Sequence, residues 1–403
     1  MDLKWNFLTI LLLEIIFLLH HGWKADATLS KSKKKKDTCK SNDCKEKMQK
    51  VVGPITSSVF TNNLVSKNIK YQDILKYNKA YFDDVYERKF MGDVLGYVTP
   101  WNNHGYDVAK TFPKFTLISP VWLQIVQPQL GVYKIKGTHD IDEKWIRDVR
   151  NKNHLAKIVP RMLLDGWSLE GFVSLFSQSQ YMYKFVDTIV NFVDERNLDG
   201  IVLEIWSQLG GNYKSEASQL IKELGEAMMS RKQKLILVIP PPLAARDTPG
   251  MFDRNDFELL APIVDGFSLM TYDYPHYGSP GAVAPYDWIK DCVENLVPEK
   301  TLFRQKLLLG LNFYGYTYKG RSQTPIVGHA YLEMLEQHKP HLKWQKESRE
   351  HKIEYKEDKK TRTTIYYPSL QSIEERIQLA NELGTGLSIW EIGQGLDFFY
   401  DLL

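Results

Sequence analysis

Residues 197–206 read Asn-Leu-Asp-Gly-Ile-Val-Leu-Glu-Ile-Trp and place a carboxyl group two residues before an indole in an apolar run. Residues at i, i+2 and i+4 of a strand share one face, so Val202, Glu204 and Trp206 are predicted to point the same way. A carboxyl group can give or take a proton in catalysis, whereas an indole N–H only donates a hydrogen bond. The run therefore offers Glu204 as an acid–base group and Trp206 as a flat apolar surface.

Other apolar runs end in aromatic and acidic residues of the kind that line binding sites. These residues are Tyr97 and Trp101, then Met270, Tyr272 and Asp273, then Tyr314, and finally Trp390. Each has a simpler explanation, because aromatic residues also fill protein interiors. Asp273 could instead begin a helix as its N-cap, and Glu204 could be a buried carboxylate bonded to a neighbour such as Tyr272.

Eight short apolar runs alternate with stretches of helical periodicity, which is typical of repeated βα units. The runs are 93–99, 115–123, 156–162, 200–205, 234–239, 266–272, 306–313 and 386–390. Several are apolar throughout, as expected for parallel strands covered on both faces. We therefore predict an α/β fold, a (β/α)₈ TIM barrel over residues 80–403. The long interval at about 316–371 should contain its own structure, and we expect a small α+β insertion there, between strands 7 and 8.

The order of these motifs resembles the family 18 glycoside hydrolases, the chitinases. Their fourth strand carries Asp-Gly-x-Asp-x-Asp-x-Glu, and here only Asp199-Gly200 is kept, with Val202, Glu204 and Trp206 at the other positions. Residues 270–273 match the family's Met-x-Tyr-Asp, and residues 309–315 match its Leu-Gly-x-x-x-Tyr-Gly, followed by Tyr316 where the family has Arg. The family's Ser-x-Gly-Gly is missing from the third run, which reads Ile158-Val159-Pro160-Arg161-Met162.

The resemblance implies a substrate-assisted hydrolase site at the C-terminal ends of the strands, with Trp390 beneath the sugar. Because the position of the family's acid is Trp206, we expect no catalytic residue and no hydrolase activity. We expect instead a chitinase-like lectin that binds chitooligosaccharides. The carbohydrate-binding residues would be Tyr97, Trp101, Glu204, Trp206, Met270, Tyr272, Asp273, Tyr314 and Trp390.

Two alternatives stay open at this point. The chain could be an active glycoside hydrolase that uses Glu204, although Glu204 lies about 6.6 Å before the acid position at ~3.3 Å per residue. It could also be a protein-interaction scaffold whose cleft Trp206 closes. Residues 92–101 and 388–397 further resemble a branch of the family that interacts with stabilin-1. That likeness implies a scavenger-receptor partner, and binding of microbial saccharides such as lipopolysaccharide in innate immunity.

The N-terminus reads as a signal peptide, residues 1–27, with Lys4 before an apolar run and Ala25-Asp26-Ala27 as the cleavage site. We therefore expect a secreted or lysosomal protein with no transmembrane segment. Residues 28–79 are predicted to be a basic N-terminal extension, in which Cys39 and Cys44 could form a disulfide. The net charge is +3 and includes the run Lys33–Lys36, which does not indicate a nucleic-acid partner. No cysteine or histidine cluster suggests a metal, and no cofactor is expected.

Overall fold

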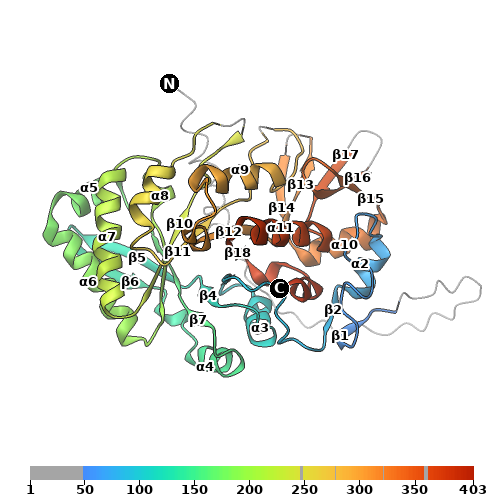
Figure 1. The fold of residues 1–403 in the computed structure, drawn as a ribbon, viewed down its shortest axis with the longest axis horizontal. Helices are drawn as coiled ribbons and strands as arrows, with labels where there is room; N and C mark the ends of the chain where they lie inside the picture. Colours follow the sequence, from blue (N-terminus) through green and yellow to red (C-terminus); the bar gives the residue numbers. More distant parts are fainter. Residues whose placement is uncertain (1–48, 246–247, 277, 321, 358–361) are drawn as a thin grey trace, which may run out of the picture. The chain divides into compact units, whose positions relative to one another are not determined.

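The computed structural model describes residues 49–403 except 246–247, 277, 321 and 358–361. The predicted signal peptide, the run Lys33–Lys36 and the predicted disulfide Cys39–Cys44 therefore lie outside the described residues. The described residues form an α/β fold with one curled sheet of 11 strands, one antiparallel sheet of 5 strands and one pair of strands (Figure 1).

Every predicted apolar run contains a strand of the curled sheet. In chain order the strands of the whole curled sheet are β3 (Val94–Val98), β4 (Leu117–Pro120), β5 (Leu123–Gln129), β6 (Val132–Lys136), β7 (Lys157–Ile158), β8 (Arg161–Leu164), β9 (Gly200–Glu204), β10 (Lys234–Ile239), β11 (Gly266–Leu269), β12 (Leu307–Asn312) and β18 (Gly386–Trp390). Their order in the sheet is β6-β5-β8-β9-β10-β11-β12-β18-β3-β4-β7. Except for β5 with β6, neighbouring strands are parallel.

The third run is split at Val159-Pro160, and the split explains how the sheet curls. Before the split β7 pairs with β4, and after it β8 pairs with β9. Proline has no N–H to continue a ladder, and the Pro160 carbonyl instead accepts from the Val202 amide at 3.0 Å. One short stretch of chain therefore contacts strands from opposite parts of the sheet order.

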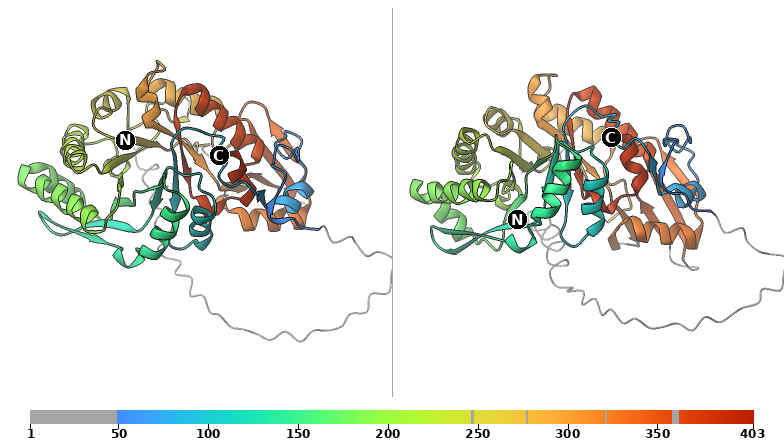
Figure 2. Two further views of the ribbon diagram at one scale, coloured as in Figure 1. Left: turned by 60° about the horizontal axis from the view of Figure 1, so that its bottom comes forward. Right: turned by 90° about the horizontal axis from the view of Figure 1, so that it is seen from below.

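The helices lie outside the curled sheet (Figure 2). They are α3 (Asn103–Thr111), α4 (Glu143–Lys152), α5 (Leu169–Ser177), α6 (Ser179–Glu195), α7 (Lys214–Ser230), α8 (Arg254–Leu260), α9 (Tyr286–Leu296) and α11 (Leu370–Leu383). Alternate side chains of a strand face the helices or the inside of the sheet. In β9, for example, Leu203 belongs to the large core shared with the helices, whereas Val202 packs inside with Val238 and Leu308. Cys292 of α9 is a buried free thiol.

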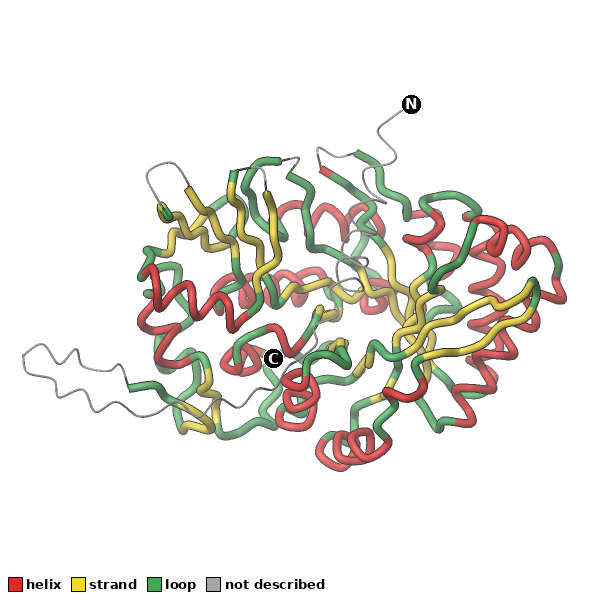
Figure 3. The backbone as a smooth tube through the Cα atoms, turned by 180° about the vertical axis from the view of Figure 1, so that it is seen from behind, coloured by secondary structure: helices red, strands yellow, loops and turns green. Residues whose placement is uncertain are grey.

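Five strands between β12 and β18 in the chain form the antiparallel sheet in the order β14-β13-β17-β16-β15 (Figure 3). Its strands are β13 (Gly315–Lys319), β14 (Ser322–Ile326), β15 (Leu342–Gln345), β16 (Glu350–Lys356) and β17 (Arg362–Tyr366). Helix α10 (Gly328–His338) connects β14 to β15.

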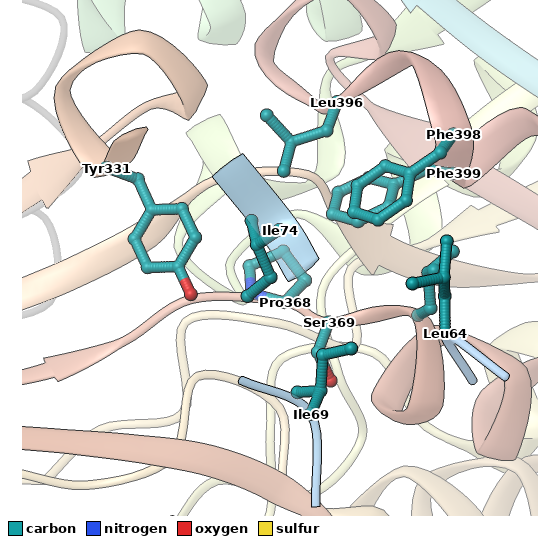
Figure 4. A pocket seen from close by; sticks show the side chains of 10 residues that line it. Leu64, Ile69, Ile74, Tyr331, Pro368, Ser369, Leu396, Phe398 and Phe399 are labelled. Atoms are coloured by element: carbon teal, nitrogen blue, oxygen red, sulfur yellow. The ribbon is translucent and has the colours of Figure 1, made fainter. Parts of the chain in front are cut away.

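The segment before β3 packs against the C-terminal end of the chain. Strand β1 (Val52–Ile55) pairs in parallel with β2 (Lys79–Phe82), and α2 (Tyr71–Tyr77) lies between them in sequence. The Phe82 amide donates to Asp401 Oδ1 at 2.9 Å. Side chains from this segment meet others from α10 and from the 3₁₀ turn η6 (Asp397–Leu402) around a cavity of about 10 Å³, namely Leu64, Ile69, Ile74, Tyr331, Phe398 and Phe399 (Figure 4). That space holds at most about one water molecule, so it is a packing gap in the core.

Candidate functional site

Trp390, the last residue of β18, lies on the inner side of the curled sheet beside Tyr97 of β3. The centroids of the two rings are 5.1 Å apart with a tilt of 55°. The Arg161 guanidinium carbon lies 5.9 Å from the Trp390 ring centroid. Tyr97 is only 2% exposed, whereas Trp390 is half-buried. Part of the Trp390 indole therefore remains available to a ligand.

Hydrogen bonds between strands hold Tyr97, the neighbour of Trp390, in place. The Tyr97 hydroxyl donates to Ser268 Oγ at 2.9 Å, and Ser268 Oγ lies 2.8 Å from Ser388 Oγ. These residues come from β3, β11 and β18. Burial raises the pKa of Tyr97, so this phenol remains a neutral donor. Residues from three strands therefore fix the position of the Tyr97 ring.

Glu204 ends β9 and forms an ion pair with Arg161, which begins β8. The guanidinium Nε and Nη2 atoms each lie 2.6 Å from Glu204 Oε2. Only 13% of the Arg161 side chain and 12% of the Glu204 side chain are exposed. Burial lowers the pKa of Arg161, but the adjacent Glu204 carboxylate raises it more, so the guanidinium stays charged. Both contacts fall on Oε2, which leaves Oε1 for a ligand.

Trp206 does not lie where the strand pattern predicts. Strand β9 ends at Glu204, Ile205 has φ −131° and ψ −36°, and the 3₁₀ turn η2 (Trp206–Leu209) follows. The strand alternation therefore stops before Trp206, which packs against Phe252 with ring centroids 5.0 Å apart and donates to the Met251 carbonyl. Trp206 is 1% exposed in the large core. The predictions that it binds sugar or closes a cleft are both wrong for this reason.

Asp273 follows β11 in the chain and accepts hydrogen bonds from two tyrosine hydroxyls. It accepts from the Tyr314 hydroxyl at 2.6 Å and from the Tyr316 hydroxyl at 3.0 Å. The next helix, α9, begins at Tyr286 after Pro285, so Asp273 is not a helix N-cap. Asp273 is exposed and has φ 59°, a conformation that is uncommon for a residue other than glycine. An exposed carboxylate with two ordered donors can accept further hydrogen bonds from a ligand.

Tyr272 lies near both this carboxylate and the ion pair. Burial raises the pKa of Tyr272, and nearby Tyr97, Asp273 and Glu204 add to the effect. Tyr272 and Trp390 both pack against a cluster that contains Tyr314 and Tyr316. The structure thus brings together a set that we call the strand-end site: Tyr97, Arg161, Glu204, Tyr272, Asp273 and Trp390.

Two other predicted residues lie differently. Met270 is half-buried and packs with Trp390 against the inner cluster. Trp101 lies in the turn between β3 and α3 and is 62% exposed. Among the described residues there is no group of three or more His, Cys, Asp or Glu that could hold a metal ion. In the same part of the chain, no helix is both long and apolar enough to cross a bilayer.

Arg161, Ser268 and Ser388 are not among the residues predicted from the sequence. Arg161 carried a usable signal, because a cation near the end of a buried apolar run needs a counter-charge. Glu204 is the acidic residue of the next run along the chain. Ser268 and Ser388 gave no such signal, since a serine within a strand is compatible with either face.

Comparison with known proteins shows the family of the chain. Residues 93–395 match the model of the glycosyl hydrolases family 18, and the chain belongs to this family. It is 21% identical over 222 residues to an uncharacterized glycosylase, YvbX, from Bacillus subtilis, covering 54% of this chain and 64% of that protein. The chain thus spans less than two thirds of the length of this relative.

Solved structures share the fold. A chitinase from Chromobacterium violaceum superposes with a TM-score of 0.66 at 19% identity, covering 77% of this chain and 97% of that one. A mutant chitinase from Cycas revoluta in complex with (GlcNAc)₄ superposes with a TM-score of 0.63 at 16% identity, covering 77% and 98%.

These comparisons correct one prediction. We expected the chain not to be an enzyme, but its family is one of glycosyl hydrolases and its relative is a glycosylase. The expectation rested on Trp206 standing in place of an acid, and Trp206 lies outside the strand-end site.

Proposed function

We propose that this chain binds oligosaccharides of N-acetylglucosamine at the strand-end site. The observation that carries the proposal is the half-buried Trp390 ring at the end of β18, which lies near both Tyr97 and Arg161. A pyranose that covers the indole would bury apolar area worth about 25 cal/mol per Å². The solved complex of the Cycas revoluta chitinase with (GlcNAc)₄ supports this class of ligand. We also propose that the curled sheet and its helices form a closed (β/α)₈ barrel that carries this site.

Polar groups around Trp390 suit the substituents of such a sugar. Asp273 is exposed and can accept from an acetamido N–H or a hydroxyl, while the neutral Tyr272 hydroxyl can donate. Glu204 Oε1 lies outside the contacts with Arg161 and offers a further acceptor. Small-molecule sites commonly combine an apolar surface with a few placed polar groups.

Hydrolysis of the same saccharide is the second candidate, favoured by the family and by Glu204. The chemistry needs a carboxyl group that protonates the leaving oxygen at ~2.6–3.2 Å. Glu204 is the carboxyl group at the end of β9, and both of its contacts with Arg161 involve Oε2 rather than Oε1. The sugar would have to lie deep enough between the strands to reach it.

Calorimetric titration with chitooligosaccharides of increasing length, with analysis of the recovered sugar, tests both candidates. Saturable heat supports binding, and shortened products support hydrolysis. No heat with any oligosaccharide would refute the proposed function. If products form, Glu204→Gln should abolish them while binding persists. Glu216→Gln, at an exposed glutamate of α7, should leave both unchanged.

Secretion, residence in the lysosome, and recognition of lipopolysaccharide and stabilin-1 in innate immunity also belong to this proposal. Only the sequence resemblance supports them. N-terminal sequencing of protein collected from the culture medium tests secretion, and a first residue near 28 is expected. Immobilised stabilin-1 and lipopolysaccharide should each retain the purified chain, and a failure to do so would remove that partner.

A further inference from the structure

A second hollow lies away from the strand-end site and shares no residue with it. It has a volume of about 310 Å³ and is lined by Lys67, Trp344, Lys346, Arg349 and Glu375, which we call the basic hollow. This volume is at the lower end of the roughly 300–1,000 Å³ of small-molecule sites. The lining comes from the segment before α2, from the β15–β16 hairpin and from α11. Three separate parts of the chain thus converge on it.

Positive charge prevails in the basic hollow. Its one carboxylate, Glu375, is already bound by two of the three cations. Arg349 Nη1 donates to Glu375 Oε2 at 2.7 Å, and Lys67 Nζ lies 3.3 Å from Glu375 Oε1. Among the residues that the structure describes, no carboxylate lies within ion-pair distance of the third cation, Lys346. An anion entering the hollow would therefore meet a surplus of positive charge.

The hollow also has an aromatic wall. Trp344 is half-buried, and Lys67 Nζ lies 5.6 Å from its ring centroid. The rings of Trp344 and His351 pack in an edge-to-face arrangement, with centroids 4.9 Å apart. A partly exposed indole next to ammonium groups suits a ligand that combines an apolar ring face with an anionic substituent.

The surrounding contacts hold these groups in place before any ligand arrives. His351 Nε2 lies 3.1 Å from the Lys67 carbonyl oxygen, and His351 Nδ1 lies 2.8 Å from Ser369 Oγ. Arg349 stacks on Tyr286, with the guanidinium carbon 3.5 Å from the ring centroid. A site whose side chains are already ordered loses less conformational entropy on binding.

We propose that the basic hollow binds a pyranose that carries a sulfate or phosphate ester. Lys346, Arg349 and Lys67 would contact the ester, and Trp344 would contact the sugar ring. The chain would then recognise acidic substituents of a glycan at a site separate from Trp390.

The test is an NMR titration of the full chain carrying ¹⁵N-labelled tryptophan, at low salt. The probes are N-acetylglucosamine 6-sulfate, N-acetylglucosamine 6-phosphate, neutral N-acetylglucosamine and inorganic sulfate. Trp344→Phe assigns the indole signal. We expect at least one of the two esters to change the chemical shift of the Trp344 indole N–H saturably. Which ester does so decides whether the site prefers sulfate or phosphate. Both free sugar and inorganic sulfate should bind more weakly than that ester.

The matched variants are Lys346→Glu and Lys343→Glu, which make the same charge change at exposed residues. Lys343 precedes Trp344 on β15 and so faces the other side of the strand. Lys346→Glu should weaken ester binding by roughly tenfold, and Lys343→Glu should not. Equal effects of the two variants, equal binding of the neutral sugar or of inorganic sulfate, or no ester binding would each overturn the proposal. Trp390→Ala should leave ester binding unchanged, and this separates the result from the fate of the strand-end site.

Discussion

Trp206 follows one apolar run and Trp390 ends another, yet the two residues lie in opposite surroundings. Trp206 is packed against Phe252 in the core shared with the helices, whereas Trp390 is half-buried inside the curled sheet. Strand β18 is still paired at Trp390, opposite Asn312 of β12. Strand β9 has its last pairing at Glu204, opposite Leu163 of β8. Alternation thus determines where a side chain points only as far as the strand itself extends.

The largest effect is expected for Trp206→Ala. Removing this buried indole leaves a cavity in the core, and such truncations cost about 3–5 kcal/mol of unfolding free energy. Chemical denaturation followed by circular dichroism measures the loss. The remaining folded protein should bind chitooligosaccharide like the parent. Weaker sugar binding with unchanged stability would put Trp206 back in the site.

A pH effect is expected from Glu391, the residue after Trp390. Burial raises the pKa of this carboxyl to about 7, although it accepts from Asn102 Nδ2 at 2.7 Å and from the Gly393 amide at 2.9 Å. The folded state therefore holds this proton up to a higher pH than the unfolded state, whose pKa is about 4.3. Stability from this group is present at low pH and is lost as the pH rises from about 4.3 through 7.

The expected loss from Glu391 is up to about 4 kcal/mol at ~1.36 kcal/mol per pKa unit. His351 acts in the opposite direction, because burial lowers its pKa to about 4. The difference between parent and Glu391→Gln isolates the glutamate. Urea unfolding at pH 5 and pH 8 should show a smaller drop for Glu391→Gln. Parallel pH profiles for the two proteins would contradict the assignment.

Trp390→Ala should change affinity more than stability. Loss of the ring face should weaken chitooligosaccharide binding by about 10–100-fold, since each ~1.4 kcal/mol is a factor of ten. Calorimetry gives the affinity and a thermal melt checks folding. An unchanged affinity would show that the sugar does not lie on Trp390.

The smallest effect belongs to Trp101→Ala. Because Trp101 is 62% exposed in a turn, its removal should alter stability by less than about 0.5 kcal/mol. A change in affinity of a few-fold at most is expected, and it would grow with oligosaccharide length if longer sugars reach the turn. A loss as large as that of Trp390→Ala would extend the site to Trp101.

The sequence predicts the strands well because buried parallel strands are apolar on both faces. It also predicts that Tyr97, Tyr272, Asp273 and Trp390 gather, since the ends of parallel strands share one edge. It does not reveal that β9 stops at Glu204, because the turn at Ile205 depends on how Trp206 packs against Phe252. The bonds of Tyr314 and Tyr316 to Asp273 likewise depend on how the segment after β12 leaves the sheet.

The contact between the Phe82 amide and Asp401 joins residues that are 319 positions apart, and β3 also pairs with the late strand β18. During synthesis at ~5–20 residues per second, the early segments wait roughly 15 seconds to a minute for these partners. Strand β3 has an unpaired edge throughout that time, and such edges readily pair with other chains. The edge of β3 therefore stays open to pairing with other chains until β18 has been made.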